Sequence, residues 1–346
     1  MYLKDLVDIQ MGQSPDSKFY NYDKIGLPFY QGKADFGRIN PTPKIWCSKS
    51  KKEAKPNDIL ISVRAPVGDL NINNEQSCIG RGLAAITCKS DVDMMYLYYH
   101  LKYLKPQLSH ISTGSTFESI NRSQLENLII DYKPYSEQIK ISNILQVVQR
   151  QIEVREKLLR LYDLLIKSRF VEMFGDPNAT RTKYKLVPIH MVTDCMVPGR
   201  DKPKSFTGEI PWITINDLNI NGYTNKSKLG LGLTIDEVKE VNRKCVPQGS
   251  VLMSCVGNLG LCSVASVDVV INQQLHSYQC NEFINNLYLM YYLSFKNTYM
   301  NKIASSTTVL YMNKNACNNI PVLLPPIELQ ISFAKYLNQI NKLKFD

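Results

Sequence analysis

The longest regular pattern of apolar and polar positions lies in the middle of the chain, between residues 137 and 175. Apolar residues recur there at alternating spacings of four and three, without Pro or Gly from 137 to 173. Such a heptad pattern is typical of a helix that packs its apolar seam against another helix. A straight helix of this length spans about 54 Å, which favours a projecting coiled-coil arm over an ordinary core helix. The seam residues are Ile141, Leu145, Val148, Ile152, Leu159, Tyr162 and Ile166.

A second, shorter pattern of the same kind occupies residues 328–346. Its seam residues are Phe333, Leu337 and Ile340. A P-x-x-x-Q sequence precedes both patterns, at residues 134–138 and 326–330. Because a Pro just ahead of a helix is a common entry signal, the sequence predicts two helices. We expect the short C-terminal helix to pair with the central one.

The regions between these helices repeat each other. Residues 62–138 align without a gap with residues 254–330, an offset of 192, and 15 of the 77 positions are identical. Each copy contains a β-branched, apolar strand that ends at Gly68 or Gly260. Each then continues into a tyrosine-rich segment, 94–104 or 286–296, whose spacing predicts a short helix packed into a core. The repeat predicts two related domains, residues 1–136 and 176–327, with a central helix at 137–175 and a C-terminal helix at 328–346.

Composition adds a basic charge and a pattern of isolated cysteines. Lys and Arg number 41 against 31 Asp and Glu, a formal net charge of +10, which fits either a polyanionic partner or a merely soluble basic protein. The nine cysteines form no C-x-x-C pair, and no apolar stretch approaches the roughly 20 residues of a membrane span. The N-terminal residues lack the apolar core of a signal peptide. These features favour a reducing, cytoplasmic location, and the four scattered histidines predict no metal site.

Sequence motifs of catalysis are missing. The chain has no N-P-P-[FY] or D-P-P-Y motif for adenine methylation, no G-x-G-x-x-G after a strand and no G-x-x-x-x-G-K-[ST] loop. We therefore expect a protein without an active site of its own. An enzyme whose catalytic residues come together only in the folded chain is the alternative.

The doubled order of motifs resembles the specificity subunits of type I restriction-modification systems. The resemblance rests on the two P-x-x-x-Q helices, the segment GSVLMSCVGNLG followed by INQQL, and an N-x5-N-x6-P sequence in each half. That sequence comprises Asn121, Asn127 and Pro134 in the first half and Asn313, Asn319 and Pro326 in the second. The resemblance covers essentially the whole chain.

The resemblance implies an α/β (α+β) fold with two tandem, pseudo-symmetric target recognition domains. Each would have a twisted, β-rich body, and long antiparallel coiled-coil helices would separate them. It further implies that each domain reads one half of a bipartite site in double-stranded DNA. The helices would set the spacing and dock two methyltransferase subunits, with nuclease/translocase subunits as further partners. S-adenosylmethionine and ATP would then bind to the partner subunits, and the exposed seam would also allow self-association.

Candidate DNA-reading residues lie in the polar loops of both halves. Base readout favours Arg, Lys, Asn and Gln, while hydroxyl groups and Lys suit phosphate; many of these residues also serve as turn formers or solvated charge. The candidates of the first half are Ser14, Tyr30, Gln31, Lys33, Arg64, Arg81, Ser115 and Thr116. Those of the second half are Arg200, Lys202, Lys204, Thr214, Asn216, Asn258, Gln273, Gln274, Thr308 and Tyr311.

Two other readings of the sequence stay open. A specificity subunit of a type IIB or IIG-like system shares the two-headed design and differs only in its neighbouring chains. A coiled-coil adaptor that binds protein and no DNA is a hypothesis of another class. The adaptor would show no salt-dependent binding to duplex DNA and would not need basic loops such as residues 199–204.

Overall fold

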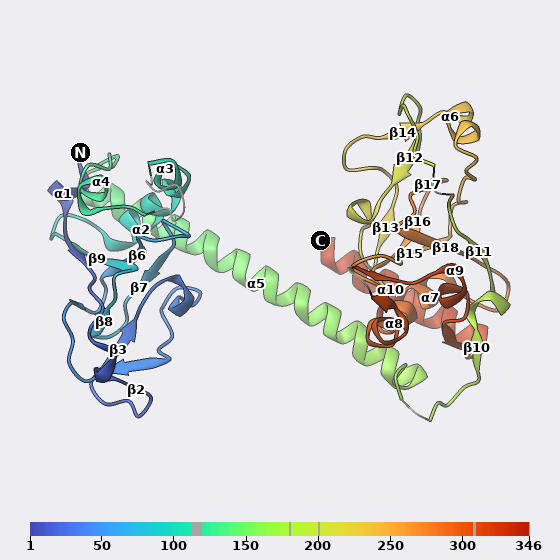
Figure 1. The fold of residues 1–346 in the computed structure, drawn as a ribbon, viewed down its shortest axis with the longest axis horizontal. Helices are drawn as coiled ribbons and strands as arrows, with labels where there is room; N and C mark the ends of the chain where they lie inside the picture. The colour runs from blue at the N-terminus through green and yellow to red at the C-terminus, as the bar shows by residue number, and fades with distance from the viewer. Residues whose placement is uncertain (112–118, 180, 200, 307–308, 346) are drawn as a thin grey trace. The chain divides into compact units, whose positions relative to one another are not determined.

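The computed structural model of the chain describes every residue except 112–118, 180, 200, 307–308 and 346. The chain forms two compact units, Met1–Arg155 and Glu156–Asp346, which we call domain 1 and domain 2. The division falls inside helix α5 (Tyr135–Phe174), so that each domain includes one part of this helix. Both domains combine β-sheets with helices, which confirms the predicted α/β class and the long helix (Figure 1).

Domain 1 is built from two β-sheets. One sheet has the order β1-β9-β6-β7 with antiparallel pairs, and the other has the order β2-β4-β3-β8-β5, in which β3 and β8 run parallel. The strands are β1 (Val7–Met11), β2 (Tyr20–Asn21), β3 (Leu27–Tyr30), β4 (Ile45–Cys47), β5 (Glu53–Ala54), β6 (Ile59–Ser62), β7 (Leu70–Ile72), β8 (Ser77–Ile79) and β9 (Leu83–Cys88). The helical segments are α1 (Leu3–Leu6), α2 (Met94–Tyr103), α3 (Lys105–Ile111), α4 (Arg122–Glu126) and the 3-10 turns η1 (Ser17–Phe19) and η2 (Lys33–Asp35).

Domain 2 repeats this plan with short additional strands. Its main sheet has the order β11-β18-β15-β16-β13, and a smaller sheet, β14-β12-β17, again contains a parallel pair. The strands are β10 (Leu186–Pro188), β11 (Thr193–Met196), β12 (Ile210–Ile213), β13 (Tyr223–Thr224), β14 (Gly232–Leu233), β15 (Val251–Ser254), β16 (Cys262–Ala265), β17 (Val270–Ile271), β18 (Leu275–Cys280), β19 (Ser305–Ser306), β20 (Leu310–Tyr311) and β21 (Pro321–Leu323). The helical segments are α6 (Ile235–Glu240), α7 (Asn286–Ser294), α8 (Asn297–Ile303), α9 (Lys314–Asn318), α10 (Ile327–Phe345), η3 (Ile189–Met191) and η4 (Ile215–Asp217).

The central strand of each domain is buried on both faces. In β6, Ile59 and Ile61 belong to the larger core beneath the helices, whereas Leu60 belongs to a smaller core on the other face. The matching strand β15 divides its side chains in the same way. A strand that is covered on both faces has consecutive apolar residues, whereas a strand covered on one face alternates apolar and polar residues. This explains the sequences ILIS of β6 and VLMS of β15.

The 192-residue repeat extends to individual hydrogen bonds. The Ser62 hydroxyl donates to the Pro66 carbonyl at 2.7 Å and accepts from the Asp69 amide at 2.9 Å. In domain 2, Ser254 makes the same two bonds, to positions 258 and 261, at 2.5 and 2.8 Å. The turn that follows the central strand is therefore closed by the same two hydrogen bonds in both domains, although the residues in it differ.

A buried glutamine fixes the start of each long helix. The side-chain amide of Gln138 accepts from the Asp93 amide at 2.8 Å and donates to the carbonyls of Asp91 and Lys133 at 3.1 and 2.8 Å. Gln330 makes the same three bonds, to positions 285, 283 and 325, at 2.8, 3.1 and 2.8 Å. Both side chains are fully buried. The glutamine of the P-x-x-x-Q sequence thus ties each helix to the body of its own domain.

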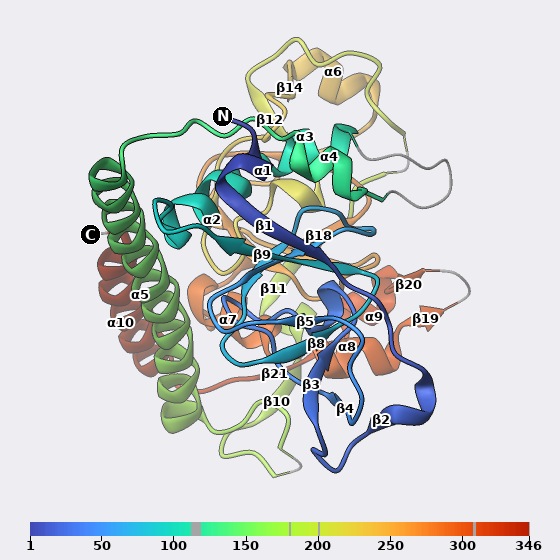
Figure 2. The same cartoon turned by 90° about the vertical axis from the view of Figure 1, so that its left-hand side faces the viewer.

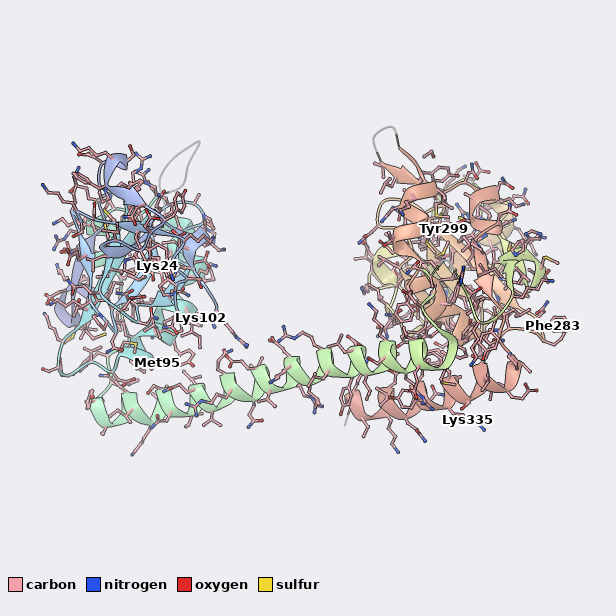
Figure 3. All side chains as sticks on the ribbon, turned by 90° about the horizontal axis from the view of Figure 1, so that it is seen from below. Lys24, Met95, Lys102, Phe283, Tyr299 and Lys335 are labelled. Carbon is pink, nitrogen blue, oxygen red and sulfur yellow. The ribbon has the colours of Figure 1, made fainter. Side chains whose placement is uncertain are left out.

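The second part of α5 packs against α10 inside domain 2. Ile166 of α5 shares a buried core with Phe333, Leu337 and Ile340 of α10. The ring centroids of Phe170 and Phe333 lie 5.3 Å apart, and an ion pair of 2.7 Å joins Lys344 to Asp163. These contacts make the two helices antiparallel neighbours, as Figure 2 shows, and Figure 3 shows Lys335 on the side of α10 away from the strands of domain 2.

The rest of the predicted seam is largely uncovered in the single chain. Ile141 is half-buried where α5 joins the body of domain 1, and Tyr162 packs against the α10 contact. Leu145, Val148, Ile152 and Leu159 are exposed. The physical reason is that the buried side chains of α5 lie near its two ends, at positions 138, 142, 166, 170 and 174, and these four lie between them. A partner for these four residues stays a prediction.

The tyrosine-rich helices pack into the domain cores, as their spacing predicts. Tyr96 and Tyr98 of α2 are buried, as are Tyr288, Tyr291 and Tyr292 of α7. The Tyr96 hydroxyl donates to the carbonyl of residue 131, and the Tyr288 hydroxyl donates to that of residue 323, again 192 positions further on. Of the described helices, none is long and apolar enough to cross a membrane.

We predict that Gln138→Leu and Gln330→Leu destabilise only their own domain, each by about 2–4 kcal/mol, because three backbone groups lose their buried partner. The two tryptophans allow a test: Trp46 reports on domain 1 and Trp212 on domain 2. Urea unfolding would be followed by fluorescence in variants that keep one tryptophan. Gln151→Ala, at an exposed position of α5, serves as the control. Equal destabilisation by the control would contradict the anchoring role.

We expect the stability of domain 2 to depend on pH because of His276. This residue is 1% exposed in β18 and lies beside the Tyr278 ring. Burial lowers the pKa of His276 to about 4. The unfolded chain takes up a proton below its ordinary pKa of about 6.5 while the folded chain does not, so stability falls as the pH drops from 6.5 towards 4. We expect domain 2 to lose roughly 1.4 kcal/mol per pH unit between pH 6 and 5, measured by urea unfolding through Trp212.

The variant His276→Gln should remove this slope in domain 2. His100, whose pKa burial also lowers, provides the matched control in domain 1, and His100→Gln should leave the slope of domain 2 unchanged. A slope that persists in His276→Gln would show that another group is responsible.

Candidate nucleic-acid interface

Four loops of domain 1 meet at a cleft of about 550 Å³. Because β3 and β8 are parallel, their carboxyl ends lie at the same edge, and the loops that follow β1 and β6 reach the same place. Predicted candidates Ser14, Gln31, Lys33, Arg64 and Arg81 all line this cleft. The fold thus brings together five residues that are up to 67 positions apart in the sequence.

Glycines permit the close approach of these loops. A Cβ atom at Gly80 would lie 3.1 Å from the Gln31 Cα and 3.2 Å from the Ser14 hydroxyl oxygen. At Gly82 it would collide with the Gln31 carbonyl oxygen. The Arg81 amide, between these glycines, donates to the Ser14 hydroxyl at 3.3 Å. The G-R-G sequence therefore holds Arg81 against the neighbouring loop by its backbone and leaves its side chain exposed.

Two arginines are available for recognition. Arg64 and Arg81 are exposed, and neither guanidinium forms a hydrogen bond or ion pair with the described residues. Lys44, which sequence reasoning missed, also lines the cleft and donates to the Ala34 carbonyl at 2.8 Å. A fork of donors on each arginine matches the edge of guanine or a phosphate. The cleft therefore suits a polyanion that presents base edges.

The loop after β3 is held by an aspartate. The Asp35 carboxylate accepts from the backbone amides of Gln31 and Gly32 at 2.7 and 3.4 Å. In domain 2, Asp217 accepts from the amide and hydroxyl of Thr214 at 2.8 and 2.7 Å. Burial of the Asp217 carboxyl opposes ionisation, but these and other hydrogen bonds outweigh it and lower its pKa. Both domains thus present the loop after a parallel strand on the same turn.

Tyr30 does not belong to this surface. Its side chain is fully buried in the smaller core of domain 1, and burial raises the pKa of its hydroxyl to about 12. The prediction that Tyr30 contacts DNA is therefore corrected: the residue ends a strand that is covered on both sides. Ser115, Thr116, Arg200 and Thr308 lie outside the described residues.

Candidates of domain 2 gather along the equivalent edge. The Asn272 amide donates to the Ile213 carbonyl at 3.0 Å, which places the Gln273–Gln274 turn next to Thr214. Gln273, Asn258, Asn216 and Tyr311 are exposed, whereas Gln274 is half-buried and accepts from Asn272 at 2.9 Å. The Cys255 amide donates to the Gln274 carbonyl, and an isolated β-bridge joins Val256 to Tyr311. The residues at this edge are mainly amides, while domain 1 presents mainly cations.

Arg243 is a functional candidate that sequence reasoning missed. It is 7% exposed, and its guanidinium lies 4.8 Å from the centre of the Trp212 ring. It donates to the Asp201 carbonyl at 3.2 and 2.6 Å and to the Ile271 carbonyl at 2.7 Å. Arg243 therefore fixes the basic loop that carries exposed Lys202 and Lys204 against the strand end before Gln273. No periodicity or motif marks this residue in the sequence.

Glu237 holds the following part of the same loop. Its carboxylate accepts from the hydroxyl of Ser205, from the amide and hydroxyl of Thr207, and from the Thr234 amide. The hydrogen bonds from Ser205, Thr234 and Thr207 lower the pKa of Glu237 to about 2. Among the described residues, no group of three or more His, Cys, Asp or Glu side chains is arranged to hold a metal ion.

Comparisons with known proteins give a consistent family match. The family described as "Type I restriction modification DNA specificity domain" matches residues 1–160 and 197–346. A protein of Methanocaldococcus jannaschii, assigned as the MjaX specificity subunit of a type I restriction enzyme, is 45% identical over 150 residues, which are 43% of this chain and 35% of that protein. The type I restriction enzyme MjaIX specificity subunit of the same organism is 28% identical over 185 residues, covering 50% of this chain and 43% of that protein.

A solved structure shares the fold over nearly the whole chain. The S subunit of the type I restriction-modification system from M. genitalium matches with a TM-score of 0.60, covering 99% of this chain and 91% of that one at 14% identity. The chain spans less than half the length of the two curated relatives. At 14% identity, the comparison with the solved structure supports the fold of the chain.

We predict that Arg243→Lys loosens the basic loop while the rest of domain 2 stays folded, because Lys cannot reproduce the forked hydrogen bonds and ring stacking. Trypsin cleavage after Lys204 should accelerate roughly tenfold for a loss of about 1.4 kcal/mol of local stability. Cleavage after Lys202 is blocked by Pro203, which makes the Lys204 product a specific readout. Cleavage after exposed Lys24 in domain 1 is the internal control, and an unchanged rate at Lys204 would refute the role of Arg243.

Proposed function

This chain belongs to the family of type I restriction modification DNA specificity domains, and on that premise we propose that it recognises a DNA sequence for a restriction-modification complex. Its curated relatives carry the name of specificity subunits. In this proposal the chain supplies recognition without catalysis. S-adenosylmethionine and ATP then bind to partner subunits, and the complex works in the cytoplasm on the DNA of the cell.

The observation that carries the proposal is the cleft of domain 1. Gln31, Arg64 and Arg81 arrive there from three separate loops, and all three side chains are exposed. Arg and Gln are the residue types that bind guanine and adenine edges through paired hydrogen bonds. A protein-binding adaptor would not need such donors at one strand edge. We infer that double-stranded DNA is the ligand and that its bases are read in this cleft.

The two related domains imply two separate DNA-recognition surfaces. Key hydrogen bonds of the scaffold repeat at an offset of 192 residues, while the loops of domain 1 carry arginines and those of domain 2 carry amides. Related scaffolds with different loop chemistry suit two different half-sites. We propose that the target is bipartite, with one half read by each domain, and that the length of α5 sets the spacing between the halves.

The long helix offers a surface for partner subunits. Leu145, Val148, Ile152 and Leu159 are exposed on α5, and burial of such apolar residues stabilises protein interfaces. We propose that two methyltransferase subunits dock on the helices and that nuclease/translocase subunits join the same complex. Without these partners, the same residues would support association between copies of the chain.

Mapping of methylated adenines in the host DNA tests the proposal. We expect a bipartite motif with a fixed gap that disappears when the chain is deleted and returns when it is restored. Methylation that is unchanged by the deletion would refute the proposed function. A continuous palindromic motif would contradict the assignment of one half-site to each domain.

Single variants should then separate the two halves of the motif. Arg81→Ala is expected to relax one half-site, and Gln273→Ala the other, because each loss of a base contact costs about 1–3 kcal/mol of discrimination. Arg122→Ala, which removes an exposed arginine that pairs with Glu126 on α4, is the matched control. If Arg81→Ala and Gln273→Ala altered the same half-site, the two domains would not be separate readers.

A further inference from the structure

Asp69 lies between two lysines at the rim of the domain 1 cleft. Its carboxylate oxygens are 2.8 Å from the Lys33 ammonium and 2.6 Å from the Lys105 ammonium. The Asp69 side chain is 19% exposed, whereas those of Lys33 and Lys105 are 47% and 41% exposed. One half-buried anion thus holds two cations that solvent can reach.

The aspartate connects the loop after β3 with helix α3. Lys33 belongs to that loop and lines the cleft, while Lys105 begins α3. The backbone of Asp69 is fixed, because its amide donates to the Ser62 hydroxyl in the repeated turn after β6. The scaffold therefore sets where the side chain begins, and the two lysines hold its carboxylate.

Domain 2 shows that the fold does not need this charged group. The positions that correspond to Asp69 and Lys105 are Leu261 and Asn297. The same turn forms there, with Leu261 donating its amide to Ser254 and Asn297 donating to the Leu259 carbonyl at 2.5 Å. Because the scaffold folds with a leucine at this position, the charge at Asp69 calls for an explanation beyond stability.

The charges at this rim partly cancel in the free chain. Burial opposes ionisation of Asp69, but the hydrogen bond from Lys105 and the ion pair with Lys33 outweigh burial and hold the pKa of its carboxyl below the usual value. The carboxylate therefore stays ionised at neutral pH and reduces the attraction of both lysines for phosphate. A phosphate can replace it as the partner of Lys33, since Lys105 would still neutralise the anion.

We propose that Asp69 is a specificity-determining residue that restrains Lys33 in the free chain and releases it to a DNA phosphate only when the bases fit the cleft. This inference rests on the proposed function. In a mismatched complex, Lys33 stays paired with Asp69, and one phosphate contact is lost. In the matched complex, the arginine contacts bring the backbone close enough for the exchange. Asp69 thus penalises DNA of the wrong sequence.

Asp69→Asn in the full chain tests the restraint, because the substitution removes the charge and keeps the shape. Binding would be measured by fluorescence anisotropy over a range of salt concentrations, with a duplex of the mapped motif and a scrambled duplex. We expect the variant to bind the scrambled duplex about three- to tenfold more tightly and the matched duplex with little change. Asp131→Asn is the control, since it removes an exposed carboxylate that pairs with Lys133 in the same domain.

Lys33→Met tests the exchange independently of Asp69. The affinity of the matched duplex should depend less steeply on salt, with the slope of log K against log salt concentration reduced by about one. The slope for the scrambled duplex should stay unchanged. An effect of Asp69→Asn no larger than that of Asp131→Asn, or an unchanged slope in Lys33→Met, would overturn the inference. Equal, weak binding of both duplexes by the unaltered chain would instead contradict the proposed function itself. Unfolding followed through Trp46 confirms that each domain 1 variant is folded.

Discussion

A fully buried glutamine amide at the start of each long helix is the contact on which the architecture of each domain depends. Gln138 and Gln330 each satisfy one backbone amide and two backbone carbonyls, drawn from the segment before a tyrosine-rich helix and from the turn into the long helix. Buried polar groups without partners are costly, so neither helix can shift by a turn without breaking all three bonds. The direction in which each helix leaves its own domain body is thereby set at its first turn.

Hydrogen bonds to backbone groups also explain how the two related domains present two kinds of surface. Ser62 and Ser254 close the same turn, and Asp35 and Asp217 hold the same loop, although the residues between them differ. Because these bonds go to backbone groups, they tolerate substitution of the neighbouring side chains. The loops could therefore diverge into a cationic surface in domain 1 and an amide-rich surface in domain 2 while these hydrogen bonds were kept.

Basic residues that look alike in the sequence play different physical roles. Arg243 is buried and holds two loops by their carbonyls, Lys33 is paired with an acid, and Arg81 is held by its backbone with its side chain exposed. Net charge alone treats these residues as equivalent. Their environments decide which of them can exchange a protein partner for a phosphate, and this selection gives a basic surface its discrimination between ligands.

The sequence by itself determined the long helix and the repeat, because these follow from local periodicity and from matching positions along one chain, and the class of fold followed from the family resemblance of the repeated motifs. It also identified Gln31, Arg64 and Arg81 as candidate DNA-reading residues in loops. Only the tertiary structure decided that these three meet in one cleft, that Tyr30 is buried, and that Arg243 and Asp69 hold neighbouring loops. It also decided that Leu145 and Ile152 are uncovered within the chain. These outcomes depend on which strands pair in parallel and which surfaces a neighbouring element covers, and such long-range contacts leave no periodic trace in the sequence.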